Sequence, residues 1–270
     1  MKTRILSALI LLPLVILVMA IGGNALYLTL CGATLIGFHE FFKAVKMEAP
    51  ILKYLASLHV VMTYAIYWLG DIDHMYILNI LLIMTMLFVY ALRFPKIELR
   101  DLAYCFYAVF YILFLMLAIA FVRDSQFYGE WMIWLIFVIA FMSDSAAYFV
   151  GVNFGKHKLV PRLSPKKTIE GAVGGLMGGG LSAMIFGFIM YFVGPFDVWY
   201  QVAAMFLVGV IGSIVSQVGD LVGSAMKRQT GIKDFGKIIP GHGGILDRLD
   251  SILVTAAYVY LMQTIVSTFM

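Results

Sequence analysis

Nine stretches of mostly apolar residues follow one another along the chain, separated by short polar or charged breaks. They cover residues 5–21, 25–42, 52–70, 75–92, 102–122, 131–150, 171–194, 198–223 and 251–268. Most are close to the roughly 20 residues that a helix needs to cross a bilayer, since a helix rises about 1.5 Å per residue. The alternating pattern of a membrane β-barrel is absent. The pattern therefore predicts an all-α, polytopic transmembrane bundle of about nine spans, which forms a single integral membrane domain over residues 1–270.

Composition supports lipid as the solvent of this chain. Hydrophobic residues make up 63% of it and charged residues 13%, whereas ordinary soluble chains are about 45–50% apolar and about 25% charged. A soluble domain of 270 residues could not bury that much apolar surface. We expect membrane lipid as a partner and no nucleic acid.

Basic residues determine the expected orientation. With nine crossings and the N-terminus inside, 18 of the 19 Lys and Arg residues fall on one side, and Arg123 alone falls on the other. Positive residues collect on the cytoplasmic side of membranes. The chain is therefore predicted to be N-in and C-out in the cell inner (plasma) membrane, with its active site facing the cytoplasm. Residues 1–25 also resemble a cleaved secretory signal, but a retained first span agrees better with the charge count.

Two acidic residues lie inside predicted spans, where a charge costs about 2.5–3.5 kcal/mol. Asp144 stands seven residues before Gly151, and Asp220 stands seven residues before Lys227, so both are expected about 10 Å inside the cytoplasmic end of their helices. One polar stripe runs along the helix of Asp220: Gly209, Ser213, Ser216, Asp220, Ser224 and Lys227. Close helix packing explains the small residues of this stripe. A structural polar pair is the alternative reading of the two carboxylates, and a functional site is the reading that we favour.

The segment after this stripe combines carboxylates, glycines and basic residues. Asp247 and Asp250 stand three residues apart at a helix start, so their oxygens share one face and suit Mg²⁺. Gly243 and Gly244 allow close backbone approach and can present N–H groups to an anion. Four basic side chains supply positive charge for phosphates: Lys227, Arg228, Lys233 and Arg248. Membrane anchoring would explain the basic residues alone, but the whole pattern favours phosphoryl or nucleotidyl transfer.

Other polar residues leave two interpretations open. His242 stands among the glycines and could contact phosphate, act as an acid or base, or stabilise the turn. Thr168 precedes the seventh span as a helix cap, and Lys166 and Lys167 could place charge at the same helix end. Structural capping explains this second cluster as well as substrate contact does. His39, Glu40 and His59 are isolated, and we interpret them as packing or interface residues.

The run from Ser224 to Asp250 resembles the signature of the phosphatidate cytidylyltransferases, also called CDP-diacylglycerol synthases. It reads Ser-x-x-Lys-Arg, then Lys-Asp, then His-Gly-Gly-x-x-Asp-Arg-x-Asp, with every fixed position intact. The Ser-Asp-Ser-Ala-Ala-Tyr sequence around Asp144 and the Ser-Pro-Lys-Lys-Thr-Ile-Glu-Gly sequence are also similar to that family. Residues 1–100 carry no motif, so residues 101–270 form the expected catalytic half.

The resemblance implies that CTP and phosphatidic acid react to give CDP-diacylglycerol and pyrophosphate with Mg²⁺. It implies metal binding by Asp220 and Asp247. The other catalytic residues it implies are Lys227, Arg228, Asp250 and His242. The substrate-binding residues it implies are Lys166, Lys167, Ser224, Lys233, Arg248, Gly243, Gly244 and Asp144, and Asp144 and Asp250 are also weaker candidates for metal ligands. The resemblance further implies a homodimer and a monovalent cation such as K⁺ beside Mg²⁺.

Two alternatives remain at this stage. A CTP-dependent lipid kinase of the polyprenol or phytol type would share the membrane architecture and the cytidine donor. A cation-coupled transporter would use the intramembrane carboxylates as ion sites, and inverted repeats would support it. No matching halves are found in the sequence, and the intact signature favours the cytidylyltransferase.

Overall fold

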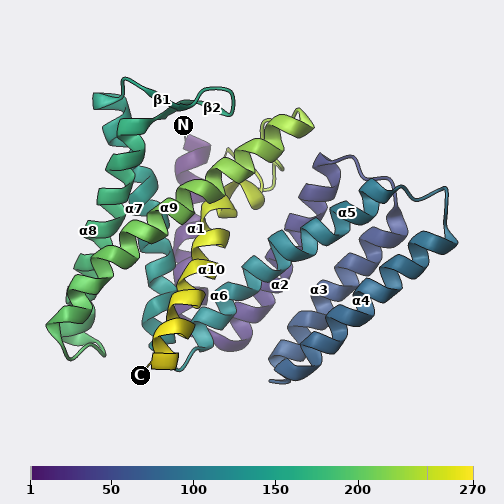
Figure 1. Ribbon diagram of the computed structural model, residues 1–270, viewed down its shortest axis with the longest axis horizontal. Helices are drawn as coiled ribbons and strands as arrows, with labels where there is room; N and C mark the ends of the chain where they lie inside the picture. Colours follow the sequence, from purple (N-terminus) through teal and green to yellow (C-terminus); the bar gives the residue numbers. More distant parts are fainter. Residues whose placement is uncertain (1, 242, 270) are drawn as a thin grey trace. The chain divides into compact units, whose positions relative to one another are not determined.

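A computed structural model describes residues 2–241 and 243–269, and most of these residues are helical (Figure 1). The helices are α1 (Lys2–Ile21), α2 (Gly23–Ala44), α3 (Pro50–Trp68), α4 (Ile72–Leu92), α5 (Leu99–Tyr107), α6 (Phe114–Asp124), α7 (Gly129–Phe154), α8 (Ile169–Val193), α9 (Trp199–Thr230) and α10 (Leu246–Phe269). A π-helical segment, η1 (Ala108–Leu113), joins α5 to α6, and strands β1 (Lys158–Val160) and β2 (Ser164–Thr168) precede α8. Each apolar stretch predicted from the sequence is helical.

Several of these helices can cross a membrane. Within the described residues, seven are long and apolar enough: Gly23–Ala44, Asp73–Leu92, Leu99–Asp124, Gly129–Phe154, Ile169–Val193, Trp199–Thr230 and Leu246–Thr268. In the first predicted span, the part of α1 that counts as a shorter apolar helix is Leu11–Ile21. The chain is a multi-pass helical membrane protein, while the count of nine spans and the N-in orientation stay predictions.

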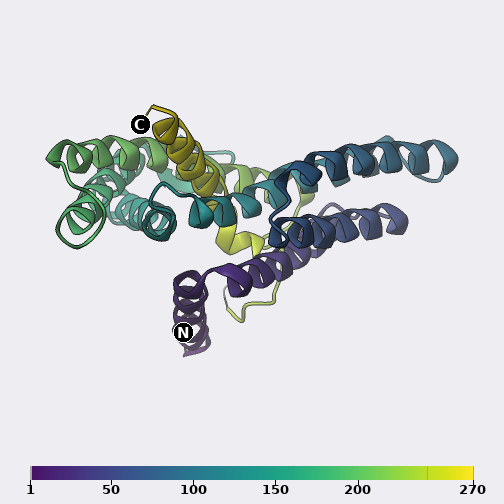
Figure 2. The same cartoon turned by 90° about the horizontal axis from the view of Figure 1, so that it is seen from below.

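The chain divides into two compact units. The first comprises Met1–Ala120 and Ile232–Asp247. In it, α3 and α4 run side by side, as both Figure 1 and Figure 2 show. His59 of α3 is buried, and its Nε2 lies 3.2 Å from Oδ1 of Asn79 in α4. The interpretation of His59 as a packing residue is therefore confirmed.

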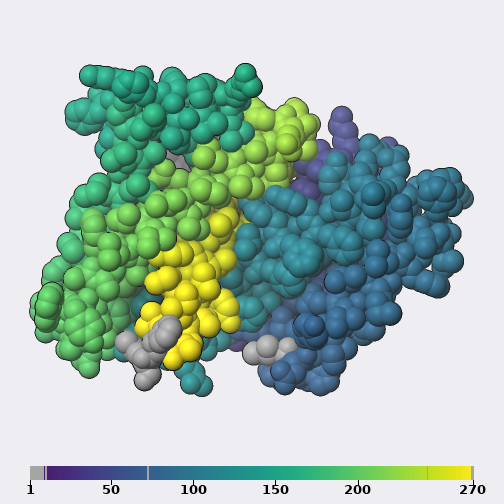
Figure 3. Space-filling view, in the orientation of Figure 1, coloured from purple at the N-terminus to yellow at the C-terminus, as the bar shows by residue number. Residues whose placement is uncertain are grey.

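The second unit comprises Phe121–Gly231 and Arg248–Met270. Helix α8 packs against both α7 and α9, and α10 lies against α9, as the yellow and green surfaces in Figure 3 show. Strands β1 and β2 form an antiparallel hairpin in which Lys158 pairs with Thr168 and Val160 pairs with Ser164. The segment between the sixth and seventh predicted spans thus contains a β-hairpin that hydropathy did not indicate.

Helix α9 extends well beyond its apolar stretch. The sequence predicted a span that ends near residue 223, but the helix continues to Thr230 and includes Lys227 and Arg228. It stops at Gly231, whose φ of 72° is left-handed and suits glycine at a helix C-terminus. Basic residues in the last turn are favourable there because they face the negative end of the helix dipole. Hydropathy marks where lipid contact ends, and the helix itself ends one to two turns later.

Candidate active site

Three carboxylates converge in the second unit. Asp144 of α7, Asp220 of α9 and Asp250 of α10 lie close enough for their charges to interact. Asp144 is exposed, and Asp220 and Asp250 are partly buried. We call these three residues the carboxylate cluster. The sequence predicted Asp144 and Asp220 at comparable depth, and the fold brings them together with Asp250.

Glycines in α8 and α9 make this convergence possible. A Cβ atom on Gly175 of α8 would lie 2.7 Å from Nε2 of Gln217 and 3.0 Å from the carbonyl oxygen of Ser143. A Cβ atom on Gly223 of α9 would lie 2.9 Å from Oδ2 of Asp250. All three distances are at or near the shortest that real Cβ atoms show, so a larger residue at either position would displace Gln217, the backbone of α7 or Asp250. Gly209 of the small-residue stripe also packs closely, as expected, because a Cβ atom there would lie 2.4 Å from the carbonyl oxygen of Gly179. Close packing of this kind positions the carboxylates.

Two lysines balance part of the negative charge. Lys167 Nζ pairs with Asp220 Oδ2, and these side chains are 26% and 30% exposed. Lys227 Nζ lies 3.8 Å from Asp250 Oδ2, and these side chains are only 16% and 13% exposed. Asp250 also accepts a hydrogen bond from its neighbour, since the N–H of Ser251 lies 2.9 Å from Oδ1. Lys167 and Lys227, both predicted to bind substrate phosphates, therefore hold carboxylates in this structure.

The β1–β2 hairpin carries Lys166 and Lys167 and is fixed at its end. Thr168 caps α8, because its Oγ1 accepts a hydrogen bond of 3.1 Å from the N–H of Gly171. The predicted cap is therefore confirmed. Arg228 Nε donates a hydrogen bond of 3.3 Å to the carbonyl of Leu163. This bond attaches the hairpin to the end of α9. The side chain of Lys166 on the same hairpin is exposed.

In the first unit, residues 232–241 and 243–245 belong to a glycine-rich loop ahead of α10. Oδ2 of Asp247 accepts hydrogen bonds from the N–H groups of Phe235 and Gly244, at 2.8 and 2.9 Å. The N–H of Ile239 donates to the carbonyl of Gly243 at 2.9 Å, and the φ of 88° at Gly243 favours glycine. Asp247 thus organises the loop that precedes it. His242 lies outside the described residues.

Glu40 of α2 is the residue that sequence reasoning missed. It is only 2% exposed, and its two carboxylate oxygens accept hydrogen bonds from the N–H groups of Ile245 and Leu246 at 3.1 and 3.0 Å. The interpretation of Glu40 as a packing residue is confirmed by its burial, but Glu40 is not isolated, because a buried carboxylate needs donors and finds them 205 and 206 residues away. A carboxylate in an apolar span was the available signal, but the sequence does not identify its partner.

The predicted site residues therefore divide between the two units. The second unit contains the carboxylate cluster with Lys166, Lys167, Ser224, Lys227, Arg228 and Arg248. The first unit contains Asp247, Lys233, Gly243 and Gly244. The assignment of a metal to Asp220 and Asp247 stays a prediction. Over the described parts of the chain, no three His, Cys, Asp or Glu side chains are arranged to enclose a metal ion.

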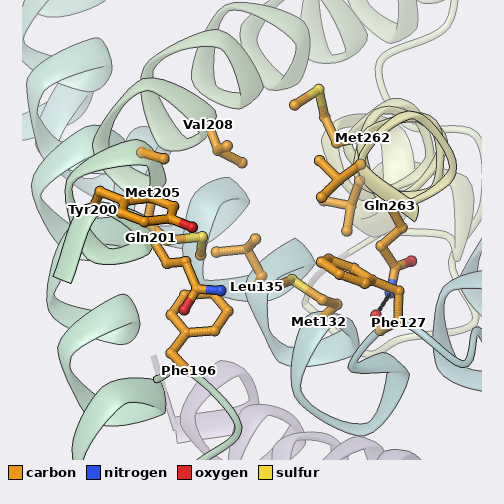
Figure 4. Close-up of a pocket in the computed structure, with 13 residues that line it drawn as sticks. Phe127, Met132, Leu135, Phe196, Tyr200, Gln201, Met205, Val208, Met262 and Gln263 are labelled. Atoms are coloured by element: carbon orange, nitrogen blue, oxygen red, sulfur yellow. Dashed lines mark hydrogen bonds between the residues drawn. The ribbon is translucent and has the colours of Figure 1, made fainter. Parts of the chain in front are cut away.

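A pocket of about 220 Å³ also lies in the second unit (Figure 4). Its lining comes mainly from α7, α9 and α10 and includes Met132, Leu135, Met205, Val208 and Met262. Gln263 donates 2.8 Å and 3.4 Å hydrogen bonds to the carbonyls of Phe127 and Val122. Leu135 stands nine residues before Asp144 on α7, which is about 14 Å along the helix. An apolar lining does not solvate phosphates, so this pocket is not where the chemistry of the carboxylate cluster takes place.

Comparisons with known proteins find similar sequences over most of this chain. The model of the Cytidylyltransferase family matches residues 2–266. A protein of Staphylococcus haemolyticus named phosphatidate cytidylyltransferase is 33% identical over 259 residues, which is 94% of this chain and 95% of that relative. Proteins of the same name from Bacillus subtilis and Brucella suis are each 40% identical over 146 and 157 residues. Those two alignments span only about half of each relative, 52% and 56%.

Proposed function

Because this chain belongs to the cytidylyltransferase family, we propose that it transfers CMP from CTP to phosphatidic acid, giving CDP-diacylglycerol and pyrophosphate for phospholipid biosynthesis. An oxygen of the lipid phosphate forms a bond to the α-phosphorus of CTP. The bond between the α- and β-phosphates breaks, and its electron pair leaves with pyrophosphate. The observation that carries the proposal is the match over nearly the whole chain, joined to a cluster of carboxylates and lysines.

The chemistry requires two anions to approach each other. Phosphoryl transfer of this kind depends on positioning and charge stabilisation more than on a covalent intermediate. The lysines and arginines of the site offset the repulsion between the lipid phosphate and CTP. Lys227 and Arg228 continue α9 past its apolar stretch, and Lys166 is exposed on the hairpin. These positions support their assignment to phosphate binding.

The charge of the carboxylate cluster supports a divalent cation. Three carboxylates and the paired Lys167 and Lys227 sum to one net negative charge when all are ionised. Such a cluster would repel triphosphate and lipid phosphate alike. Mg²⁺ usually takes one or two carboxylates together with substrate phosphates and water, so a site without three enclosing side chains suits it. When bound, Mg²⁺ would stabilise the charge that develops on the phosphoryl oxygens.

We assign Asp220 and Asp247 to Mg²⁺ as the sequence suggests, with Asp144 and Asp250 as further ligands or supporting groups. The interaction of Asp144 and Asp250 with Asp220 favours their participation. The one-sided basic residues support an active site on the cytoplasmic side of the inner membrane. A homodimer and a K⁺ ion belong to the same proposal and rest on the family resemblance.

A thin-layer assay with purified protein, Mg²⁺, phosphatidic acid and CTP tests the function. With CTP labelled at the α-phosphate, the proposed activity places label in a liponucleotide. In a parallel reaction, CTP labelled at the γ-phosphate releases its label as pyrophosphate. A lipid kinase would instead move the γ-label onto a lipid alcohol, and a transporter would form no labelled lipid. Either of these last two outcomes contradicts the proposal.

A further inference from the structure

Glu40 occupies a place where a carboxylate has a specific task. Its side chain leaves α2 near the end of that helix and is buried. It accepts the N–H groups of Ile245 and Leu246 at the start of α10, where the helix dipole favours negative charge. Removing a charge from water is costly unless hydrogen bonds compensate it, so burial of this carboxylate indicates that the contact matters to the protein.

The glycines of the loop are shaped to this carboxylate. The three heavy atoms nearest to a Cβ atom on Gly244 would all belong to the carboxylate of Glu40, at 2.3 to 2.5 Å. A Cβ atom on Gly236 would also collide with Glu40 Oε1. Neither glycine has a positive φ, so the backbone alone does not require glycine at these positions. The side chain of Glu40 is the nearest obstacle to a Cβ atom at both positions, and at Gly236 the Cα atom of Gly244 also lies 3.0 Å away.

The loop is therefore held by two carboxylates at neighbouring points. Asp247 accepts the N–H groups of Phe235 and Gly244, and Glu40 accepts the two that follow Gly244 along the chain. Asp247 lies in the first turn of α10. Glu40 holds that turn through the N–H group of Leu246, and Asp247 projects from it. All of these residues belong to the first unit.

We propose that Glu40 is a positioning residue that anchors the glycine-rich loop and the first turn of α10, and through them the side chain of Asp247. This role rests on the proposed function, because Asp247 matters only if it serves CMP transfer. In the proposed role, Glu40 contacts the loop and α10 and neither substrate. Its loss misplaces a catalytic carboxylate, and such misplacement lowers the rate of the chemical step more than it weakens substrate binding.

The experiment compares Glu40→Gln and Glu40→Ala with wild type in detergent. Gln keeps the shape and one oxygen acceptor, whereas Ala removes both acceptors. We expect kcat to fall about 10- to 100-fold in Glu40→Ala, and less in Glu40→Gln, with the KM for CTP changed less than about threefold. Glu48→Gln is the matched control, since Glu48 is an exposed glutamate beyond the end of α2, and it should keep wild-type values.

Limited trypsin digestion reports on the anchor without any catalysis. Lys233 and Lys237 are exposed in the loop, so cleavage after them measures how often the loop opens. Both Glu40 variants should be cut there faster than wild type at a temperature well below their Tm. If wild type forms no liponucleotide, the proposed function fails, yet the digestion still tests the anchor. Wild-type kcat together with wild-type cleavage in Glu40→Ala would overturn the inference.

A double-mutant cycle guards against a general folding defect. Gly244→Ala should speed loop cleavage in the wild-type background because the new methyl group collides with Glu40. In the Glu40→Ala background the carboxylate that the methyl group would meet is gone, so the same substitution should add little further effect. Additive effects of the two substitutions would contradict the proposed anchor.

Discussion

Replacing Asp220 with Asn separates the chemical role of this carboxylate from its role in stability. Asn keeps the size of the side chain and removes its charge. The substitution breaks the ion pair with Lys167, in which the two side chains are 26% and 30% exposed. Pairs of this kind contribute about 0.2–1 kcal/mol to the free energy of unfolding. The substitution also removes the repulsion that Asp220 exerts on Asp144 and Asp250. Because these effects oppose each other, we expect Tm to change by no more than about 4 °C.

Turnover should respond far more strongly than stability. A bound metal supplies several kcal/mol of stabilisation to the charge of the transition state, and about 1.4 kcal/mol corresponds to a tenfold change in rate. Asp220→Asn should therefore lower liponucleotide formation by about two to three orders of magnitude at saturating Mg²⁺. The labelled-CTP assay described above measures this loss directly.

Thermal shift with Mg²⁺ provides a readout that is independent of turnover. A ligand at about 100 times its Kd stabilises the folded state by about 2.7 kcal/mol, which raises Tm by several degrees. Wild type should show this rise and Asp220→Asn should not. Asp197→Asn, an exposed change near the opposite end of α9, should behave as wild type. The metal assignment is refuted if Asp220→Asn turns over at the wild-type rate and gains the same stabilisation from Mg²⁺.

Two further substitutions test the supports of the site. Thr168→Ala removes the side-chain cap of α8 and should lower the free energy of unfolding by about 1 kcal/mol. This loss should appear as a Tm lower by about 2–4 °C. Thr168→Ser keeps the hydroxyl and should retain most of the wild-type stability. Lys227→Met removes the partner of Asp250 in a largely buried ion pair and should lower the free energy of unfolding by about 3 kcal/mol. Adding Asp250→Asn to this variant should recover most of the lost stability. An unchanged Tm in Thr168→Ala, or an additive loss in the double variant, would contradict these assignments.

Much of the fold was predictable because lipid imposes simple rules on a sequence. A helix in the bilayer satisfies its own backbone, so long apolar stretches indicate helices without knowledge of their partners. The cost of intramembrane charge identified Asp144 and Asp220 as residues that need an explanation. Thr168 was recognisable as a cap because capping is local and depends on residues three positions apart.

The partners of these residues could not be predicted, because they depend on which helix faces meet. Lys167 and Asp220 are 53 residues apart, and Glu40 lies 205 residues from its first donor. Hydropathy also does not show that Asp250 faces α9, since that contact relies on the missing side chain of Gly223. Sequence periodicity places a residue on a helix face, whereas the packing of several helices decides what that face meets.

The hydrogen bonds of the glycine-rich loop limit how it can meet a substrate. Glycine-rich segments at helix starts commonly bind phosphate through their N–H groups. Here four such groups already donate to Glu40 and Asp247. A phosphate that took them would leave a buried carboxylate without donors, which costs several kcal/mol. We therefore expect the basic side chains near the loop, such as Lys233 and Arg248, to meet the phosphates, while Gly244 provides the close approach that Glu40 requires.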